Sequence, residues 1–223
     1  NKKSNYETDI FKDYIQKVEE ITQKKYLNNY HPDAKSDIAF RVIADHLRAV
    51  AFGIADGELP SNSGAGYVLR RILRRAVRYY YSFLGYSKPL MYRLVSLLAE
   101  KNQDIFPDLK EQKDFIEKVI REEENSFLHT LSEGLQRLEL IFENSKKISG
   151  AQAFELYDTF GFPIDLTRLI AEEQDVGVDL DGFEKELIKQ RERSRADSAR
   201  SLSDWTEITD SNSPSSFEGY DLL

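Results

Sequence analysis

Apolar residues recur every three or four positions along most of the chain, a spacing that places them on one face of an α-helix. This pattern predicts a first helix over residues 8–27, a second over residues 36–55 and an arginine-rich third that ends near Tyr81. A fourth helix is expected to open near Pro89, because proline suits the first turn of a helix. A long helix is expected over residues 111–144.

The second part of the chain carries clear signals for where helices begin and end. The segment Ser149-Gly-Ala-Gln152 has the spacing of a capping box, so a short helix should begin there and stop near Gly161. Asp165 is expected to cap the next helix, and a last helix with many paired charges covers residues 182–200. No segment alternates apolar and polar residues as a half-buried strand would, so the sequence predicts an all-α fold.

The composition changes near the C-terminus, where serine, aspartate and asparagine become frequent. We expect a helical bundle of two packed subdomains, residues 1–145 and 146–200, followed by an irregular tail over residues 201–223. The tail is interpreted as a linker toward another domain. Because the chain begins at Asn1 and its one methionine is Met91, we interpret it as a piece of a longer protein.

The charge of the whole chain argues against a nucleic-acid-binding protein. Its 31 Lys and Arg against 39 Asp and Glu give a net charge of −8, whereas phosphate-binding domains are usually basic. The absence of cysteine excludes disulfides, thiolate zinc sites and cysteine nucleophiles within this chain. The longest apolar run, around residues 49–55, is much shorter than the roughly 18–20 residues that span a bilayer.

The segment 66–78 departs from this acidic average. It holds no acidic residue and five arginines, namely Arg70, Arg71, Arg74, Arg75 and Arg78. On a helix these arginines cover an arc of roughly 140°, and apolar residues fill the rest. A run of charge is most often a solvated face, but such faces usually mix signs. The pattern therefore favours a nucleic-acid backbone, since arginine suits phosphate; pairing with distant acidic residues, or an acidic protein partner, is the alternative.

The loop before this helix adds small residues at a helix N-terminus, where backbone amides bind anions. These residues are Ser61, Ser63, Gly64 and Gly66. Asn62 in the same loop has both a donor and an acceptor, so it can read a base edge or simply stabilise a turn. The two glycines do not form a dinucleotide fingerprint, because Leu69 occupies the third glycine position.

Three blocks of sequence are more specific than any single residue. They are Arg41-Val-Ile-Ala-Asp-His46-Leu-Arg48, the segment from Ala55 through Pro-Ser-Asn62 to Arg78, and Leu156-Tyr-Asp158-Thr-Phe-Gly-Phe-Pro-Ile-Asp165-Leu-Thr167. In this order they closely resemble the alanyl-tRNA synthetase family, and weaker similarity at residues 4–11 and 217–221 extends the resemblance over essentially the whole chain.

The resemblance implies a helical tRNA-recognition region between the class II catalytic core and the editing domain, both of which lie outside this chain. It implies binding to the acceptor stem of alanine tRNA, with Asn62 and Asp158 reading a guanine–uracil wobble pair. Some of the five arginines, with Ser61, Gly64 and Gly66, would contact the RNA backbone. Spacing alone does not single out Asp158, because an aspartate at a helix end is commonplace.

The parent enzyme implied by the resemblance is a cytoplasmic alanine–tRNA ligase that uses ATP and Mg²⁺ and carries zinc in its editing domain. We expect the present chain alone to be monomeric and catalytically inactive. Two other functions stay open, a helical protein-docking module and, less favoured, a complete small enzyme. The acidic run Glu122-Glu-Glu124 on the predicted long helix is interpreted as a solvated face that limits where an RNA stem can lie.

Overall fold

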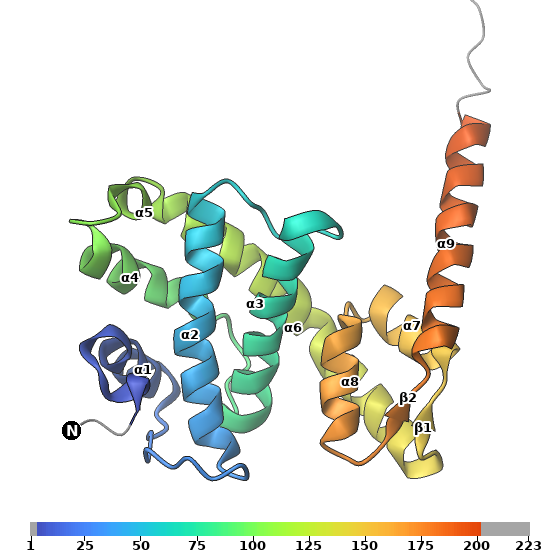
Figure 1. Cartoon of the computed structure of the whole chain (residues 1–223), viewed down its shortest axis with the longest axis horizontal. Helices are drawn as coiled ribbons and strands as arrows, with labels where there is room; N and C mark the ends of the chain where they lie inside the picture. Colours follow the sequence, from blue (N-terminus) through green and yellow to red (C-terminus); the bar gives the residue numbers. More distant parts are fainter. Residues whose placement is uncertain (1–3, 202–223) are drawn as a thin grey trace, which may run out of the picture.

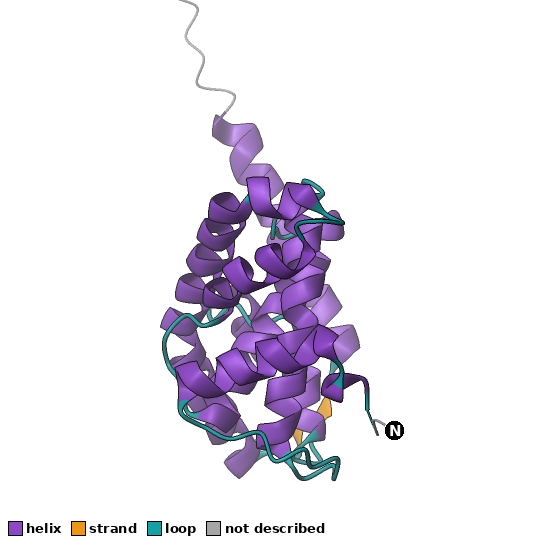
Figure 2. Cartoon of the chain, turned by 90° about the vertical axis from the view of Figure 1, so that its left-hand side faces the viewer, coloured by secondary structure: helices purple, strands orange, loops and turns teal. Residues whose placement is uncertain are grey.

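A computed structural model describes residues 4–201 of the chain, and side chains as far as residue 195. The first group of helices is η1 (Asn5–Glu7), α1 (Asp9–Thr22), α2 (Lys35–Ala55), α3 (Gly64–Leu84), η2 (Met91–Leu94), α4 (Val95–Asn102) and α5 (Pro107–Glu111). The rest comprises α6 (Lys113–Asn144), β1 (Lys147–Ile148), α7 (Gly150–Asp158), α8 (Ile164–Glu172), β2 (Gly177–Val178) and α9 (Leu180–Ser201). Helices dominate both views of this part of the chain (Figures 1 and 2), so the predicted all-α class is confirmed.

The long helix α6 joins the two ends of the molecule. It lies against α3 and η2 in the first group and then extends to the group formed by α7, α8 and α9 (Figure 1). There, β1 and β2 form a two-stranded parallel pair, with Lys147 opposite Gly177 and Ile148 opposite Val178. These strands are too short to give a sequence pattern. The division into subdomains at residue 145 stays a prediction.

The main core lies where α2 packs against α3. The face of α2 that carries Phe40, Ile43, Leu47, Val50 and Ile54 is completely buried. This burial follows from the helical spacing of its apolar residues, and removal of that surface from water drives the packing. Because α3 is the neighbour of this buried helix, the arginines on its other side are held on a rigid support.

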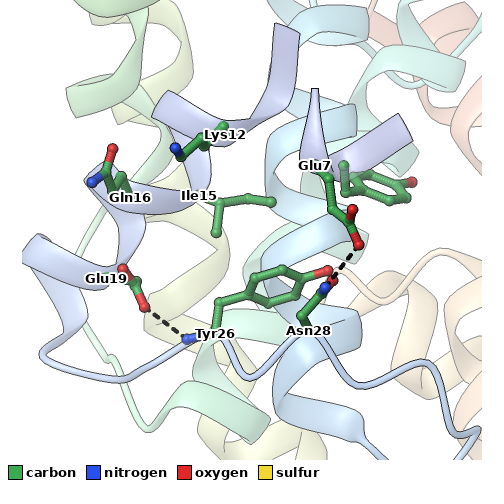
Figure 3. Close-up of a pocket in the computed structure, with 8 residues that line it drawn as sticks. Glu7, Lys12, Ile15, Gln16, Glu19, Tyr26 and Asn28 are labelled. Atoms are coloured by element: carbon green, nitrogen blue, oxygen red, sulfur yellow. Dashed lines mark hydrogen bonds between the residues drawn. The ribbon is translucent and has the colours of Figure 1, made fainter. Parts of the chain in front are cut away.

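The loop after α1 replaces the last turn that the sequence predicts. The helix ends at Thr22, because Gln23 adopts a left-handed conformation with φ 57°. Figure 3 shows how side chains then hold the extended segment: the backbone N–H of Tyr26 donates to Glu19 at 2.8 Å, and Asn28 donates to Glu7 at 2.8 Å. A hollow of about 420 Å³ lies between this segment and α1.

Two further element predictions need correction. Pro89 precedes the helices rather than opening one, since η2 begins at Met91 and α4 at Val95. Asp165 lies inside the first turn of α8, whose N-cap is Pro163, and its side chain is used by arginines of α3. The capping box of Ser149 and Gln152 is confirmed, with both reciprocal hydrogen bonds present.

The interpretation of the acidic run as a solvated face is wrong for two of its three residues. Glu124 is completely buried, and its carboxylate accepts hydrogen bonds from the Tyr80 hydroxyl at 2.9 Å and from the backbone N–H of Leu90 at 2.9 Å and Met91 at 2.8 Å. Glu123 is also largely buried, in ion pairs with arginines of α3. Burial raises the pKa of Glu124, while these backbone hydrogen bonds oppose the rise.

Candidate nucleic-acid interface

The loop that carries Asn62 is folded onto the start of α3. The backbone N–H of Ser61 donates to the carbonyl of Gly66 at 3.1 Å, and the Ser61 hydroxyl donates to the carbonyl of Ser63 at 2.8 Å. A side chain at position 66 would collide with the carbonyl of Leu59, so only glycine permits this close approach. Ser61 and Gly66 therefore shape the loop, and their contact with RNA stays a prediction, as does that of Gly64.

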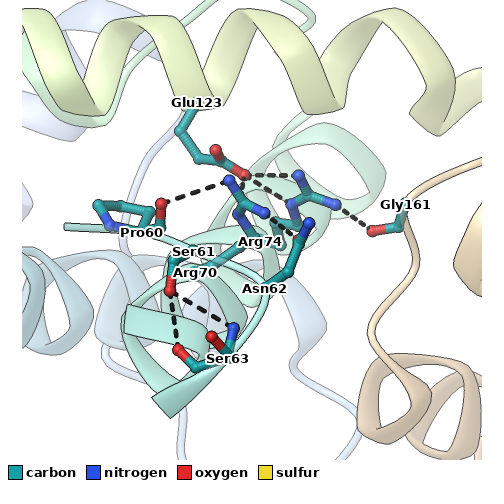
Figure 4. Close-up of polar contacts among 8 residues, drawn as sticks. All are labelled: Pro60, Ser61, Asn62, Ser63, Arg70, Arg74, Glu123 and Gly161. Atoms are coloured by element: carbon teal, nitrogen blue, oxygen red, sulfur yellow. Dashed lines mark hydrogen bonds and ion pairs between the residues drawn. The ribbon is translucent and has the colours of Figure 1, made fainter. Parts of the chain in front are cut away.

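Arg70 fixes the side chain of Asn62. Its Nη1 donates to Asn62 Oδ1, its Nη2 donates to the carbonyl of Pro60 at 3.3 Å, and its Nε lies 3.1 Å from Glu123 Oε1 (Figure 4). Asn62 itself is exposed to solvent. One arginine thus ties the loop before α3 to a carboxylate on α6.

Arg74 makes the corresponding connection to the segment after α7. Its Nε and Nη2 donate to Glu123 Oε1 at 2.8 Å and 2.6 Å, and its Nη1 donates to the carbonyl of Gly161 (Figure 4). Gly161 has φ 68°, in the region that favours glycine, and α7 ends at Asp158, so the helix stops near this glycine as the sequence predicts. Thr130 on α6 also holds this turn, because its hydroxyl donates to the carbonyl of Phe160 at 2.8 Å.

Asp158 is the last residue of α7, just before the turn that Arg74 holds. Its side chain is exposed and lies 3.5 Å from Gln190 Nε2, a long hydrogen bond to α9. Asn62 and Asp158 line one cleft of about 380 Å³, together with Tyr67 and Tyr157. A larger hollow of about 600 Å³ adjoins it and shares Asn62 and both tyrosines. The fold therefore brings the two predicted base-reading residues to a single cleft.

Comparison with known proteins identifies the family. A model of the class II (A) tRNA synthetases matches residues 1–223. Three alanine–tRNA ligases are similar to this chain over 99–100% of its length: those of Christiangramia forsetii, Cytophaga hutchinsonii and Flavobacterium psychrophilum, at 53%, 52% and 50% identity. The chain belongs to the class II (A) tRNA synthetase family. This confirms the resemblance seen in the sequence, although the chain spans only about a quarter of the length of these curated relatives.

The other arginines of this synthetase helix also have acidic partners. Arg75 Nη2 lies 2.7 Å from Asp165 Oδ2, and Arg71 Nε lies 3.5 Å from the same oxygen. Arg78 donates to both carboxylate oxygens of Glu173, at 3.0 Å and 2.6 Å. Five arginines thus share the carboxylates of Glu123, Asp165 and Glu173. The alternative of pairing with distant acidic residues is therefore realised for all five, and a contact with phosphate requires surface that these pairs leave open.

Exposure separates the five arginines. The side chains of Arg71 and Arg75 are 40% and 37% exposed, whereas that of Arg78 is 6% exposed. A guanidinium that keeps donors at the surface can still contact a phosphate oxygen, because one carboxylate does not occupy its five N–H groups. Arg78 lines neither hollow and is the least exposed of the five, so it is the least accessible to a phosphate, and its contact with RNA stays a prediction.

Sequence reasoning missed several residues of the cleft. Tyr67 directly follows Gly66 of the loop, and Tyr157 directly precedes Asp158. Their positions next to predicted RNA-contacting residues could have indicated that both tyrosines line the cleft. Burial raises the pKa of Tyr67, and the nearby Asp165 adds to the rise. Arg191 lines both hollows, and Arg168 lines the larger one. Their positions in charged helices give no local signal, because only the fold places them at the cleft.

The acidic side chains that meet the arginines of α3 beside the cleft are already engaged. The carboxylates of Glu123 and Asp165 are each occupied by two arginines, and the chain has no cysteine. Across residues 4–201 no group of three or more His, Cys, Asp and Glu side chains is arranged to hold a metal ion. Over the same residues no helix combines the length and apolar character needed to cross a membrane.

Proposed function

We propose that this chain is the tRNA-recognition region of an alanine–tRNA ligase, and that its cleft binds the acceptor stem of alanine tRNA. The observation that carries this proposal is the convergence of Asn62 and Asp158 on one cleft from segments far apart in the sequence. The parent ligase would attach alanine to the tRNA in the cytoplasm at the expense of ATP. Its ATP, Mg²⁺ and editing-zinc sites would belong to segments outside this chain.

The chemistry of the two side chains suits a guanine–uracil wobble pair. In that pair the exocyclic amino group of guanine is free in the minor groove, where it is a donor. The carboxylate of Asp158 can only accept, while the carboxamide of Asn62 can donate to a base acceptor. The minor groove of an RNA helix is wide and shallow, so short side chains reach its base edges. In a guanine–cytosine pair that amino group is hydrogen-bonded to cytosine, so the cleft would face a different pattern of donors and acceptors in the minor groove.

The walls of the cleft suit the backbone on either side of such a pair. Arg71, Arg168 and Arg191 line the adjoining hollow and supply cationic donors for phosphate or ribose oxygens. Tyr67 and Tyr157 offer aromatic surface and hydroxyl groups between them. An acidic chain can therefore bind RNA locally, because arginines outnumber carboxylates among the residues that line each hollow.

The test uses the full-length ligase that contains this sequence, with wild-type alanine tRNA and a variant in which guanine–cytosine replaces the wobble. We expect Asn62→Ala and Asp158→Ala each to reduce the ratio of kcat/KM for the two tRNAs by about tenfold or more. The rate of amino-acid activation, measured by ATP–pyrophosphate exchange, should be unchanged. Asn144→Ala and Asp114→Ala are matched controls, since both residues are exposed and lie away from the cleft. Unchanged discrimination in both test variants would overturn the proposal.

A further inference from the structure

Glu123 contacts neither of the predicted base-reading residues, yet it supports both of them. It lies on α6, and its side chain is only 10% exposed. One of its oxygens, Oε1, lies within 3.1 Å of the Nε of Arg70 and within 2.8 Å of two nitrogens of Arg74. As Figure 4 shows, one of these arginines leads to Asn62 and the other to Gly161.

The contact with Arg70 determines which end of the Asn62 amide is free. A guanidinium has only donors, so the amide atom that faces Arg70 Nη1 must be the oxygen. The amino group is then the end left over for another molecule. Asn62 is consequently held as a donor, although an asparagine in isolation can present either end.

The contact with Arg74 acts on the other side of the cleft. Arg74 donates to the carbonyl of Gly161 in the turn that directly follows Asp158. Burial lowers the pKa of the Arg74 guanidinium, and the charge of Glu123 opposes that change. Without Glu123, two guanidiniums that are 21% and 12% exposed would lie close together with no anion between them. Their mutual repulsion would then move both side chains and break the contacts of Arg70 with Asn62 and of Arg74 with Gly161.

We propose that Glu123 is a positioning residue that sets the donor–acceptor polarity of the cleft. Through Arg70 it holds Asn62 as a donor. Through Arg74 it fixes the turn that follows Asp158, and the carboxylate of Asp158 is an acceptor. This proposal rests on the proposed function of the cleft. It deepens that function by assigning the cleft one donor and one acceptor, which together select a base pair with a free amino group beside an acceptor atom.

The experiment measures kcat/KM of the full-length ligase for the wobble tRNA and its guanine–cytosine variant. Glu123→Gln is expected to reduce their ratio by about tenfold or more, because a neutral amide cannot hold two guanidiniums in place. The matched control is Glu173→Gln, which neutralises a similarly buried partner of the same arginine helix at a site away from the cleft. The control is expected to retain the wild-type ratio of kcat/KM for the two tRNAs. It therefore distinguishes a specific effect of Glu123 on the cleft from the general effect of losing a buried ion pair.

A second pair of variants keeps the test valid if Glu123→Gln does not fold. Asn62→Asp retains an oxygen for Arg70 but removes the donor, so it should abolish preference for the wobble tRNA. Arg70→Lys keeps the charge but cannot contact Glu123, Pro60 and Asn62 together, so it should also reduce the ratio. Full preference in Asn62→Asp would overturn the assignment of Asn62 as donor.

The two proposals fail in different ways. If Asn62→Ala and Asp158→Ala leave the ratio unchanged, the proposed function of the cleft fails and the role of Glu123 with it. If those variants remove discrimination while folded Glu123→Gln and Arg70→Lys retain it, the positioning role alone is overturned. Thermal unfolding of every variant identifies those that are folded.

Discussion

The hydroxyl of Tyr80 donates a hydrogen bond of 2.9 Å to the carboxylate of Glu124 between α3 and α6, where both side chains are completely buried. The same carboxylate accepts from the backbone N–H groups of Leu90 and Met91, and at 3.2 Å from that of Tyr92. These amides lie at the start of the short helix η2, where backbone N–H groups have no acceptor within the helix and need one from elsewhere. Glu124 thus replaces water for four donors inside the protein.

Replacement of Glu124 by alanine should therefore destabilise the chain strongly. The variant would leave the Tyr80 hydroxyl and buried backbone N–H groups without acceptors and would open a cavity, at a cost of about 3–5 kcal/mol. Glu122→Ala is the matched control, because Glu122 is 67% exposed on the same helix and should change stability by less than about 0.5 kcal/mol. Urea denaturation of the two variants and the wild type measures the difference. Equal stability of the two variants would contradict the prediction.

The raised pKa of Glu124 also predicts a dependence on pH. The folded state holds the proton of this carboxyl more tightly than the unfolded state, where the pKa is near 4.5. The contribution of Glu124 is therefore fully present below pH 4.5 and is lost as pH rises through the higher pKa of the folded state. Compared by urea denaturation across pH, the wild type should therefore lose stability relative to the non-titrating variant Glu124→Gln as pH rises above 4.5. A gain in the unfolding free energy of the wild type relative to Glu124→Gln over the same pH range would show that the pKa is lowered instead.

Gly161 should tolerate alanine less well than another glycine of similar backbone conformation. An added Cβ would lie 2.5 Å from Arg74 Nη1, whereas at Gly85, with φ 65°, it would meet nothing within 4 Å. Gly85→Ala should cost about 1–2 kcal/mol through its backbone conformation alone. Gly161→Ala should cost about 1 kcal/mol more and, in the full-length ligase, weaken discrimination between the two tRNAs. Thermal unfolding and aminoacylation measure these effects, and equal costs at both positions would exclude the steric contribution.

The positions of most helices could be predicted because they depend on local spacing. Residues 111–144 and the capping box at Ser149 gave signals within a few neighbours, and the structure places helices there. Glu124 was misassigned although a signal existed. It lies four residues after Ile120 and three before Phe127, both buried, so it continues the apolar stripe of α6. Its place on this stripe, and not its charge, indicates burial.

The ion pairs of α3 could not be predicted, because their partners are distant in sequence. Arg74 meets Glu123 at a separation of 49 residues, and Arg78 meets Glu173 at 95. No periodicity of the helix itself identifies these carboxylates. The convergence of Asn62 and Asp158 likewise depends on how α6 and α7 are placed. The family resemblance suggested the pair, but only the fold brings them to one cleft.

The arginines of α3 are expected to divide into those that contact RNA and those that stabilise the fold. Arg71 lines the hollow beside the cleft with 40% of its side chain exposed, whereas Arg78 is enclosed with Glu173. In the full-length ligase, Arg71→Gln should weaken tRNA binding and reduce the slope of log K against log salt by about one or less, the effect of one lost phosphate contact. Binding is measured by fluorescence anisotropy over a series of salt concentrations.

Arg78→Gln should show the reverse behaviour. The slope of its binding against salt should equal that of the wild type, because no released counterion depends on this side chain. Its unfolding free energy should fall by about 2–3 kcal/mol, since Glu173 would keep a largely buried charge without its bidentate partner. Arg71→Gln should lose less than about 1 kcal/mol, because its pair with Asp165 is long and partly solvated. A reduced salt slope in Arg78→Gln with unchanged stability would contradict the prediction, because it would show that the enclosed arginine contacts RNA.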